Sequence, residues 1–351
     1  MPGRLATGGT GNDRCPAGHH ALPGAGRGRR RLGTRTSSRD NHRTFRDAQV
    51  LPMFDTVLQL DCNGRVLRLD RPRVMGIVNV TPDSFSDGGT HDTPDAAIAH
   101  GLQLAAAGAD ILDVGGESTR PGADDVPVAE ELRRVLPVIE GLVARASLPI
   151  SIDTSKPEVM RAAIAAGAGL INDVYGLRRA GALETAASLN VPVVLMHMLG
   201  EPRAMQDAPA YDDVVGDVHR FLAERIFSAE MAGIDRKRIV VDPGFGFGKT
   251  TAHNMTLLAQ LARFAELGVP VLAGLSRKRS IGELTGRDVP AGRVAGSVAA
   301  HLIAAQNGAR ILRVHDVAET VDALKILAAV VSVPVPRASK PAPTIVWPDD
   351  A

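Results

Sequence analysis

The chain has 351 residues, with 40 Lys and Arg against 39 Asp and Glu, and only 3% of the residues are aromatic. This charge balance and the scarcity of aromatic rings argue against a general nucleic-acid-binding protein, and no apolar run reaches the length of a membrane span. Two cysteines are too few for a disulfide framework, so we expect an enzyme of a reducing compartment, the cytoplasm.

The near-zero net charge averages two different segments. Residues 1–52 hold ten Arg, no Lys, three Asp and no Glu, whereas the rest of the chain holds 30 basic and 36 acidic groups. This head lacks hydrophobic periodicity, so we predict that it is disordered. Three interpretations compete: a transit peptide, a basic arm for nucleic acid, or, as we favour, sequence upstream of a true start at Met53. The Pro-rich residues 334–351 are predicted to form a tail.

A β-hairpin opens the ordered part of the chain. Alternating apolar residues at 58–61 and 66–69 flank the turn Cys62-Asn63-Gly64-Arg65. Asn-Gly between two such runs is a strong hairpin signal, because both turn residues must adopt positive φ. We therefore predict a two-stranded ribbon before the main fold.

Eight short apolar runs of strand length follow the hairpin. They occupy residues 74–80, 110–114, 149–153, 170–173, 191–197, 239–242, 269–274 and 310–314. Helical patterns rich in Ala and Leu lie between them, for example at residues 95–107, 129–144, 157–166 and 317–330. Eight strand–helix units predict an α/β fold, a (β/α)8 TIM barrel, with residues 53–333 as one domain. A doubly wound sheet is the runner-up, but no Gly-rich dinucleotide fingerprint follows the first strand.

The Gly-rich segment 244–250 looks like a phosphate-binding loop at first sight. The Walker pattern requires glycine five residues before the glycine of its Gly-Lys-Thr, and Pro243 occupies that position. The HExxH, CxxC and GxSxG patterns are also missing from the sequence. Because no convincing covalent nucleophile is found, we expect the chemistry to depend on positioning and charge stabilisation.

Polar residues stand at the predicted carboxyl ends of the strands, where the active site of a TIM barrel lies. These residues include Asn79, Asp113, Asp153, Asn172, Asp242, Ser276, Lys278, Arg313 and His315. Buried carboxylates are costly unless they are paired or hydrogen-bonded. Asp153, Asn172 and Asp242 therefore suit a ligand rich in N–H donors, such as an aminopyrimidinone edge.

The last two strands carry groups of the opposite kind. Lys278, Arg313 and His315 are interpreted as donors and cations, at the place where TIM barrels commonly bind phosphate. Asn79, together with the acidic loop residues Asp83 and Asp87, is predicted to hold Mg²⁺ jointly with phosphate oxygens, since Mg²⁺ often takes only one or two protein ligands. The expected ligand is a flat, donor-rich heterocycle that bears a phosphate or diphosphate.

Eight segments in family order resemble the signatures of the dihydropteroate synthase family. The first, residues 75–89, reads Met-Gly-Ile-Val-Asn-Val-Thr-Pro-Asp-Ser-Phe-Ser-Asp-Gly-Gly. The others lie at residues 115–122, 151–157, 171–174, 196–198, 242–249, 276–278 and 313–316. One such segment would be modest evidence, but eight in register are very specific.

The resemblance implies a transferase of folate biosynthesis. It would join p-aminobenzoate to 6-hydroxymethyl-7,8-dihydropterin diphosphate and release pyrophosphate and 7,8-dihydropteroate. The implied partners are these small molecules and a second copy of the chain in a homodimer, with no nucleic acid and no membrane. The implied cofactor is Mg²⁺.

The resemblance also assigns residues by position. The expected catalytic residues are Asp153, Lys278 and Arg313. The pterin diphosphate would contact Thr119, Asp153, Asn172, Asp242, Lys278, Arg313 and His315. Mg²⁺ would bind at Asn79 and Asp87. The p-aminobenzoate slot, where sulfonamides compete in this family, would be framed by Phe85, Pro121 and Ser276. The contact to the p-aminobenzoate carboxylate stays open between Arg279 and Ser280.

Two other functions stay open. A methyltransferase that acts on methyltetrahydrofolate would share the barrel and the pterin pocket, but the loops at 81–89 and 118–122 and the segment 313–315 argue against it. A catalytically idle paralogue would be expected to lose Asn79, Lys278 or the 313–315 segment, and all of these are present.

Other polar residues have structural interpretations. We interpret Asp113 as structural, Asp173 as a turn cap, and Lys249 as a residue that caps or solvates its loop. His197 is either a core residue or a pocket wall. Arg277 is either an ion-pair partner within the scaffold or a ligand contact.

Overall fold

Eight parallel strands form the main sheet of the computed structural model, which describes residues 58–80, 93–118, 125–200 and 209–334. The strands are β3 (Arg73–Asn79), β4 (Ile111–Gly115), β5 (Ile150–Asp153), β6 (Leu170–Asp173), β7 (Val193–Met196), β8 (Ile239–Asp242), β9 (Leu272–Ala273) and β10 (Ile311–Val314). Their spatial order is β8-β7-β6-β5-β4-β3-β10-β9. A parallel bridge between Val241 and Val271 joins the two edges of this sheet. The TIM-barrel prediction is confirmed.

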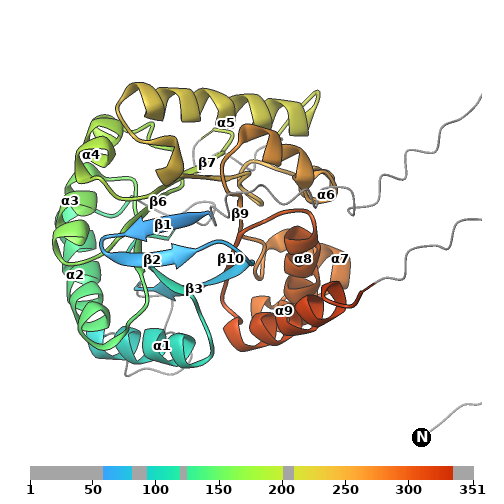
Figure 1. Ribbon diagram of the computed structural model, residues 1–351, viewed down its shortest axis with the longest axis horizontal. Helices are drawn as coiled ribbons and strands as arrows, with labels where there is room; N and C mark the ends of the chain where they lie inside the picture. Colours follow the sequence, from blue (N-terminus) through green and yellow to red (C-terminus); the bar gives the residue numbers. More distant parts are fainter. Residues whose placement is uncertain (1–57, 81–92, 119–124, 201–208, 335–351) are drawn as a thin grey trace, which may run out of the picture. The chain divides into compact units, whose positions relative to one another are not determined.

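Helices surround the strands (Figure 1). They are α1 (Pro94–Ala106), α2 (Val128–Arg145), α3 (Pro157–Ala165), α4 (Ala182–Leu189), α5 (Val214–Met231), α6 (Thr251–Ala259), α7 (Arg279–Thr285), α8 (Val294–Gln306) and α9 (Val317–Val331), with the 3-10 turns η2 (Arg236–Arg238), η3 (Leu261–Leu267) and η4 (Pro290–Arg293). Pro94 and Pro157 stand at helix starts, where a missing N–H costs nothing. The Asp213 carboxylate caps α5 by accepting from the N–H of Val215. The four helices predicted by residue range are confirmed to within one residue at each end.

Strand β9 is shorter than the predicted run 269–274. Pro270 has no N–H to donate to a neighbouring strand. Its carbonyl accepts from the N–H of Val241 at 2.9 Å, which gives only the isolated bridge at the β8 edge. After Ala273 the chain leaves the sheet toward the turn that carries Ser276.

Two apolar layers orient the side chains of the strands. One lies inside the barrel and contains Met75, Ile111, Leu170, Val194, Val240, Leu272 and Ile311. The other lies between strands and helices and contains Leu112 and Ile152. Because side chains alternate along a strand, Asp113 and Asp153 turn to the inside of the barrel, above the interior apolar layer.

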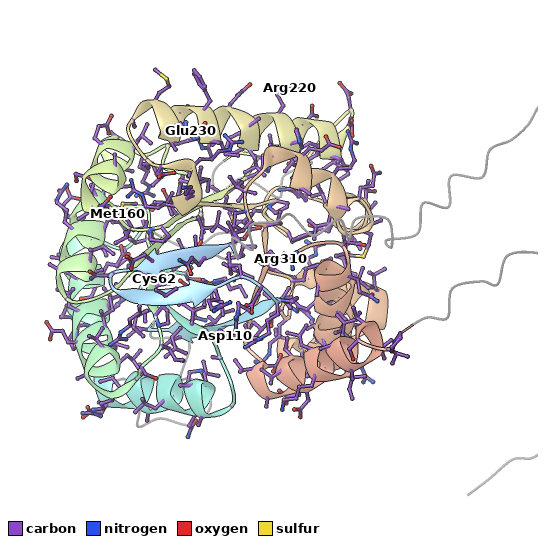
Figure 2. The ribbon with its side chains drawn as sticks, in the orientation of Figure 1. Cys62, Asp110, Met160, Arg220, Glu230 and Arg310 are labelled. Carbon is purple, nitrogen blue, oxygen red and sulfur yellow. The ribbon has the colours of Figure 1, made fainter. Side chains whose placement is uncertain are left out.

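Strands β1 (Gln59–Cys62) and β2 (Arg65–Arg68) form the predicted hairpin, which crosses the strands in Figure 1 and carries Cys62 in Figure 2. Pairing of Cys62 with Arg65 leaves Asn63 and Gly64 as a two-residue turn with φ of 56° and 83°. The hairpin contributes Leu60, Cys62, Leu67 and Leu69 to the interior apolar layer. A Cβ on Gly169 would lie 2.2 Å from the Cys62 carbonyl oxygen, so the hairpin packs directly on the barrel backbone. It covers the amino-terminal ends of the strands.

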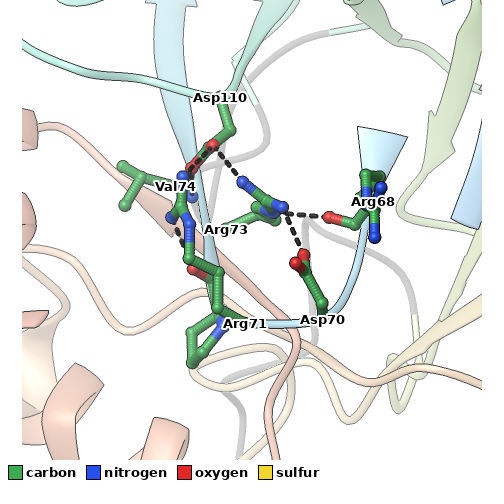
Figure 3. A network of polar contacts seen from close by, with 7 residues as sticks. Arg68, Asp70, Arg71, Arg73, Val74 and Asp110 are labelled. Carbon is green, nitrogen blue, oxygen red and sulfur yellow. Dashed lines mark hydrogen bonds and ion pairs between the residues drawn. The ribbon is translucent and has the colours of Figure 1, made fainter. Parts of the chain in front are cut away.

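An ion-pair network ties the hairpin to the barrel (Figure 3). Asp110 accepts from Arg73 at 2.9 Å, from Arg71 at 2.7 Å and from the N–H of Val74 at 2.9 Å. Arg73 also pairs with Asp70 at 2.5 Å. Both oxygens of Asp110 are therefore satisfied, and the link between hairpin and barrel is fixed at the start of β3.

The predicted head at residues 1–52 lies outside the described residues, as does the tail from residue 335 onward. Within the described ranges, no helix is both long enough and apolar enough to cross a membrane.

Candidate active site

Arg313 occupies the centre of a buried polar cluster inside the barrel. Its Nε donates to Oδ2 of Asp113 at 2.6 Å, and its Nη2 donates to Oδ2 of Asp153 at 2.7 Å. The Nδ2 of Asn172 donates to the same Asp113 oxygen at 3.0 Å. Four strands, β10, β4, β5 and β6, thus bring together three residues that the sequence assigned to the ligand and one, Asp113, that it interpreted as structural.

Burial and the neighbouring charges act in opposite directions on the pKa values of Asp153 and Arg313. Burial raises the pKa of Asp153 to about 7, a shift that Arg313 counteracts and the nearby Asp113 reinforces. Burial also disfavours charge on Arg313, but Asp113 and Asp153 raise its pKa, and the guanidinium stays charged. Oδ1 of Asp113 is buried and has no hydrogen-bond partner among the described residues. Since an unpaired buried acceptor costs free energy, this oxygen suits an N–H donor of a ligand.

Asp242 and Lys278 extend the cluster across β8 and the turn after β9. Oδ1 of Asp242 accepts from the N–H of Gly244 at 2.7 Å, and burial raises its pKa to about 6. Burial and the charge of Arg313 lower the pKa of Lys278 to about 8. The Nζ of Lys278 lies 4.2 Å from the centre of the Phe247 ring, a cation–π contact. A carboxylate and an ammonium therefore lie within electrostatic range of Arg313 and of each other.

His315 is a neutral donor or acceptor rather than the cation that the sequence analysis expected. Burial and the charge of Arg313 lower its pKa to about 3. Its Nδ1 lies 2.9 Å from Oγ of Ser276, and its backbone N–H donates to the same hydroxyl at 3.1 Å. This pair joins the end of β10 to the predicted p-aminobenzoate slot.

Arg277 is an ion-pair partner within the scaffold, which confirms one of its two interpretations. Its guanidinium bonds to both oxygens of Asp316, at 2.5 and 3.1 Å. The backbone of Arg277 has a φ of 54°, and its N–H donates to Oγ of Ser297 at 2.9 Å. Both bonded nitrogens of the guanidinium are thereby engaged by Asp316.

Two further structural interpretations are also confirmed. Asp173 caps its turn by accepting from the N–H groups of Tyr175 and Leu177, both at 2.8 Å. Lys249 caps its loop, but it is buried and not solvated. His197 is buried and lies in contact with Lys249, as a core residue beside the site.

Sequence reasoning missed a second buried charge cluster. The Nζ of Lys156 lies 2.5 Å from Glu117 and 2.5 Å from Glu131. The group links the segment after β4 to α2 and to the loop after β5. Glu131 comes from a helix face with no distinguishing motif, so only the closeness of Lys156 to Asp153 in sequence could have signalled it.

Five predicted site residues, Asp83, Phe85, Asp87, Thr119 and Pro121, lie outside the described residues. Asn79 ends β3 opposite Gly115, at the same end of the barrel as Asp153. In the described ranges no three His, Cys, Asp or Glu gather as a metal cage. Among the described residues, Asn79 offers one amide oxygen, which fits Mg²⁺ that is held chiefly by diphosphate oxygens and water.

Comparisons with known proteins agree with this geometry. Residues 75–315 match the family described as pterin binding enzyme. Dihydropteroate synthase from Escherichia coli K12 is 52% identical over 275 residues, which cover 78% of this chain and 97% of the relative. The Xanthomonas albilineans dihydropteroate synthase solved with 4-aminobenzoic acid is 72% identical and covers 80% of this chain and 100% of its own, with a TM-score of 0.76. Its structure in complex with 7,8-dihydropteroate is 69% identical, covers 79% and 100%, and has a TM-score of 0.73. The chain therefore belongs to the dihydropteroate synthase family of pterin-binding transferases.

Proposed function

We propose that the chain joins p-aminobenzoate to 6-hydroxymethyl-7,8-dihydropterin diphosphate and forms 7,8-dihydropteroate and pyrophosphate. The observation that carries this proposal is the set of buried acceptors around one guanidinium at the carboxyl ends of the strands. A flat ring rich in N–H donors satisfies these acceptors, and a diphosphate attached to that ring binds the Arg313 cation beside them. Binding of p-aminobenzoate and of dihydropteroate by close relatives supports both substrate classes.

The pterin ring pairs with the carboxylates and amide of the cluster. N–H groups of its edge donate to Asp153, Asn172 and Asp242, and the unpaired Oδ1 of Asp113 adds a fourth acceptor. These donors favour the ionised form of Asp153, whose pKa burial raises in the free protein. Arg313 supplies a planar cation beside the ring.

The diphosphate is bound at the carboxyl ends of β3, β9 and β10. Arg313 and His315 donate to its oxygens, and Lys278 adds positive charge, with Thr119 as the proposed contact from the loop after β4. Asn79 and Asp87 would hold Mg²⁺, and the bound ion would neutralise charge on the leaving pyrophosphate.

The proposed reaction is a substitution at the pterin methylene carbon. The C–O bond to the diphosphate breaks and its electron pair leaves with pyrophosphate, toward Arg313 and His315. The positive charge that develops on the pterin is stabilised by Asp153 and Asp242. The p-aminobenzoate nitrogen then forms the C–N bond with its lone pair and loses one proton. Ser276, Phe85 and Pro121 are proposed to orient that amine.

We also propose a homodimer that works in the cytoplasm. Exposed apolar side chains gather on adjacent helices near the carboxyl end of the chain: Leu284 on α7, Ile303 on α8, and Ile326, Val330 and Val331 on α9. A second copy of the chain is the occupant that the family resemblance favours. Sedimentation should show a dimer that the double variant Ile326→Asp, Val330→Asp converts to a monomer.

The catalytic unit is proposed to be residues 53–333. Chains that begin at Met1 and at Met53 should therefore show equal kcat/KM and equal Tm. Salt-sensitive binding of nucleic acid by the longer chain alone would support a basic arm instead.

The deciding experiment measures pyrophosphate release in a coupled assay. Release should require both p-aminobenzoate and the pterin diphosphate, should depend on Mg²⁺ and should be inhibited by a sulfonamide. Pterin diphosphate binding without turnover would indicate an idle paralogue. Tight binding of methyltetrahydrofolate with no pyrophosphate release would indicate a methyltransferase. Lys237→Met, at an exposed lysine of η2, serves as the matched control.

A further inference from the structure

Lys249 is a buried lysine to which the proposed reaction gives no part. It follows the loop of residues 243–248, between β8 and α6, and the residue is almost fully inaccessible to water. Within the described part of the chain, no carboxylate forms an ion pair with it. The charge of Asp242 favours the ammonium without forming a direct ion pair, and the direct contacts of Nζ must compensate for the lost hydration.

Those contacts match the three protons of an ammonium. Nζ lies 2.9 Å from the Gly244 carbonyl oxygen, 3.0 Å from that of Phe247 and 2.9 Å from Nδ1 of His197. Burial and the charge of Lys249 lower the pKa of His197 to about 2, so Nδ1 is free to accept. Burial lowers the pKa of Lys249 itself to about 7; the charge of Asp242 counteracts this shift and the charge of Lys278 reinforces it.

This ammonium holds the loop together with the side chains of Asn254 and Tyr211. Gly244, Gly246 and Gly248 all have positive φ, between 62° and 79°. Positive φ turns the loop carbonyls away from a regular ladder. The N–H of Phe247 donates to the Gly244 carbonyl at 3.2 Å, the N–H of Gly246 donates to Oδ1 of Asn254 at 2.8 Å, and the Tyr211 hydroxyl donates to the Gly248 carbonyl at 2.9 Å. Lys249 therefore binds, from within, the carbonyl oxygens of Phe247 and of Gly244, the second of which also accepts from the N–H of Phe247.

The same loop contacts two residues of the site. The N–H of Gly244 donates to Asp242, and the ring of Phe247 lies 4.2 Å from the Lys278 ammonium. A Cβ on Gly246 would lie 3.1 Å from Cδ of Lys278, so the loop backbone packs on the lysine stem. The conformation of the loop thus determines where the Asp242 carboxylate and the Lys278 ammonium stand.

We propose that Lys249 is a positioning residue for pterin binding: its ammonium holds the 243–248 loop in the shape that places Asp242 and Lys278. This inference rests on the proposed synthase function. It assigns Lys249 no contact with substrate. It predicts that loss of the ammonium weakens the pterin site more than the p-aminobenzoate slot, where Ser276 is held independently by His315.

The test replaces the ammonium by a side chain of similar length. Lys249→Met should raise the Kd for the pterin diphosphate about 10- to 100-fold, because a small misplacement of binding groups has effects of this size. The KM for p-aminobenzoate should change less than about threefold. Binding is measured by fluorescence titration of protein shown to be folded by circular dichroism, and Lys237→Met is the surface control.

A second variant acts further along the same chain of contacts. Phe247→Leu keeps the carbonyl that Lys249 binds but removes the ring beside Lys278, and it should raise the same Kd in the same direction. If Lys249→Met does not fold, this variant decides. A native Kd in folded Lys249→Met, accompanied only by a lower Tm, would overturn the proposal, and so would a native Kd in Phe247→Leu. A wild-type chain that bound no pterin diphosphate would overturn the proposed function instead.

Discussion

Both ends of the barrel are built around an arginine and its aspartates, but only one end is complete. At the amino end, Arg73 contacts Asp110, whose two oxygens accept from two arginines and a backbone N–H. At the carboxyl end, Arg313 contacts Asp113 and Asp153, yet one Asp113 oxygen has no partner in the described ranges and burial raises the pKa of Asp153 to about 7. The first network stabilises the free protein. The second lacks donors, and a ligand can provide them.

The largest expected effect is the loss of activity when Asp153, at the carboxyl end of the barrel, is replaced. Asp153→Asn replaces a carboxylate by a neutral amide at the site of developing positive charge, and kcat/KM should fall about 1,000-fold. Far-ultraviolet circular dichroism should show an unchanged fold. Activity close to that of the wild type in the coupled pyrophosphate assay would contradict the role given to Asp153.

The matched change at the amino end of the barrel, at Asp110, should lower the stability of the protein and leave its activity unchanged. Asp110→Asn leaves Arg73 and the N–H of Val74 without their full acceptor, and the free energy of unfolding should fall by about 2 kcal/mol. Urea denaturation measures that loss. The kcat/KM of the folded variant should stay within about twofold of the wild type; a large loss of activity would mean that the two ends are coupled.

The number of protons released when the pterin diphosphate binds should test the protonation state of Asp153 in the carboxyl-end network. Because the pKa of Asp153 is raised to about 7, the free protein holds about half a proton there near pH 7. Pterin N–H donors favour the carboxylate, so binding should release up to that amount. Calorimetry in buffers of different ionisation enthalpy measures it. Release should decrease and then reverse toward about pH 9, where Lys278, with its pKa lowered to about 8, takes up a proton.

The smallest effect is expected at the hairpin turn. Asn63 has a φ of 56° and its side chain donates to the Ala168 carbonyl at 3.2 Å. Asn63→Ala should cost about 1 kcal/mol of stability, through left-handed strain and the lost hydrogen bond. Thermal unfolding should show a lower Tm with unchanged kcat/KM. A loss of activity would show that the hairpin does more than cover the amino end.

The fold could be predicted because its signals are local. Asn63 and Gly64 define the hairpin turn, and the strands and helices end where Pro, Gly and capping residues stand. The site could be predicted only in part. The position of Arg313 at a strand end indicated a ligand contact, but nothing in sequence shows that it lies between Asp113 and Asp153, which are 160 and more residues away. Burial then determines the charge of His315, and burial is a property of the assembled barrel.

The short seam of the barrel has a consequence for its motions. Strand β9 has two residues, and a single bridge, Val241 to Val271, links β8 to that side. Backbone amides along this seam should exchange with solvent sooner than those of β4 or β5, since fewer hydrogen bonds must open. Asp242 stands on one side of the seam and Lys278 on the other. A pterin that contacts both residues would link the two sides of this seam. Hydrogen exchange along β9 should therefore slow when substrate is bound, and it would report substrate occupancy directly.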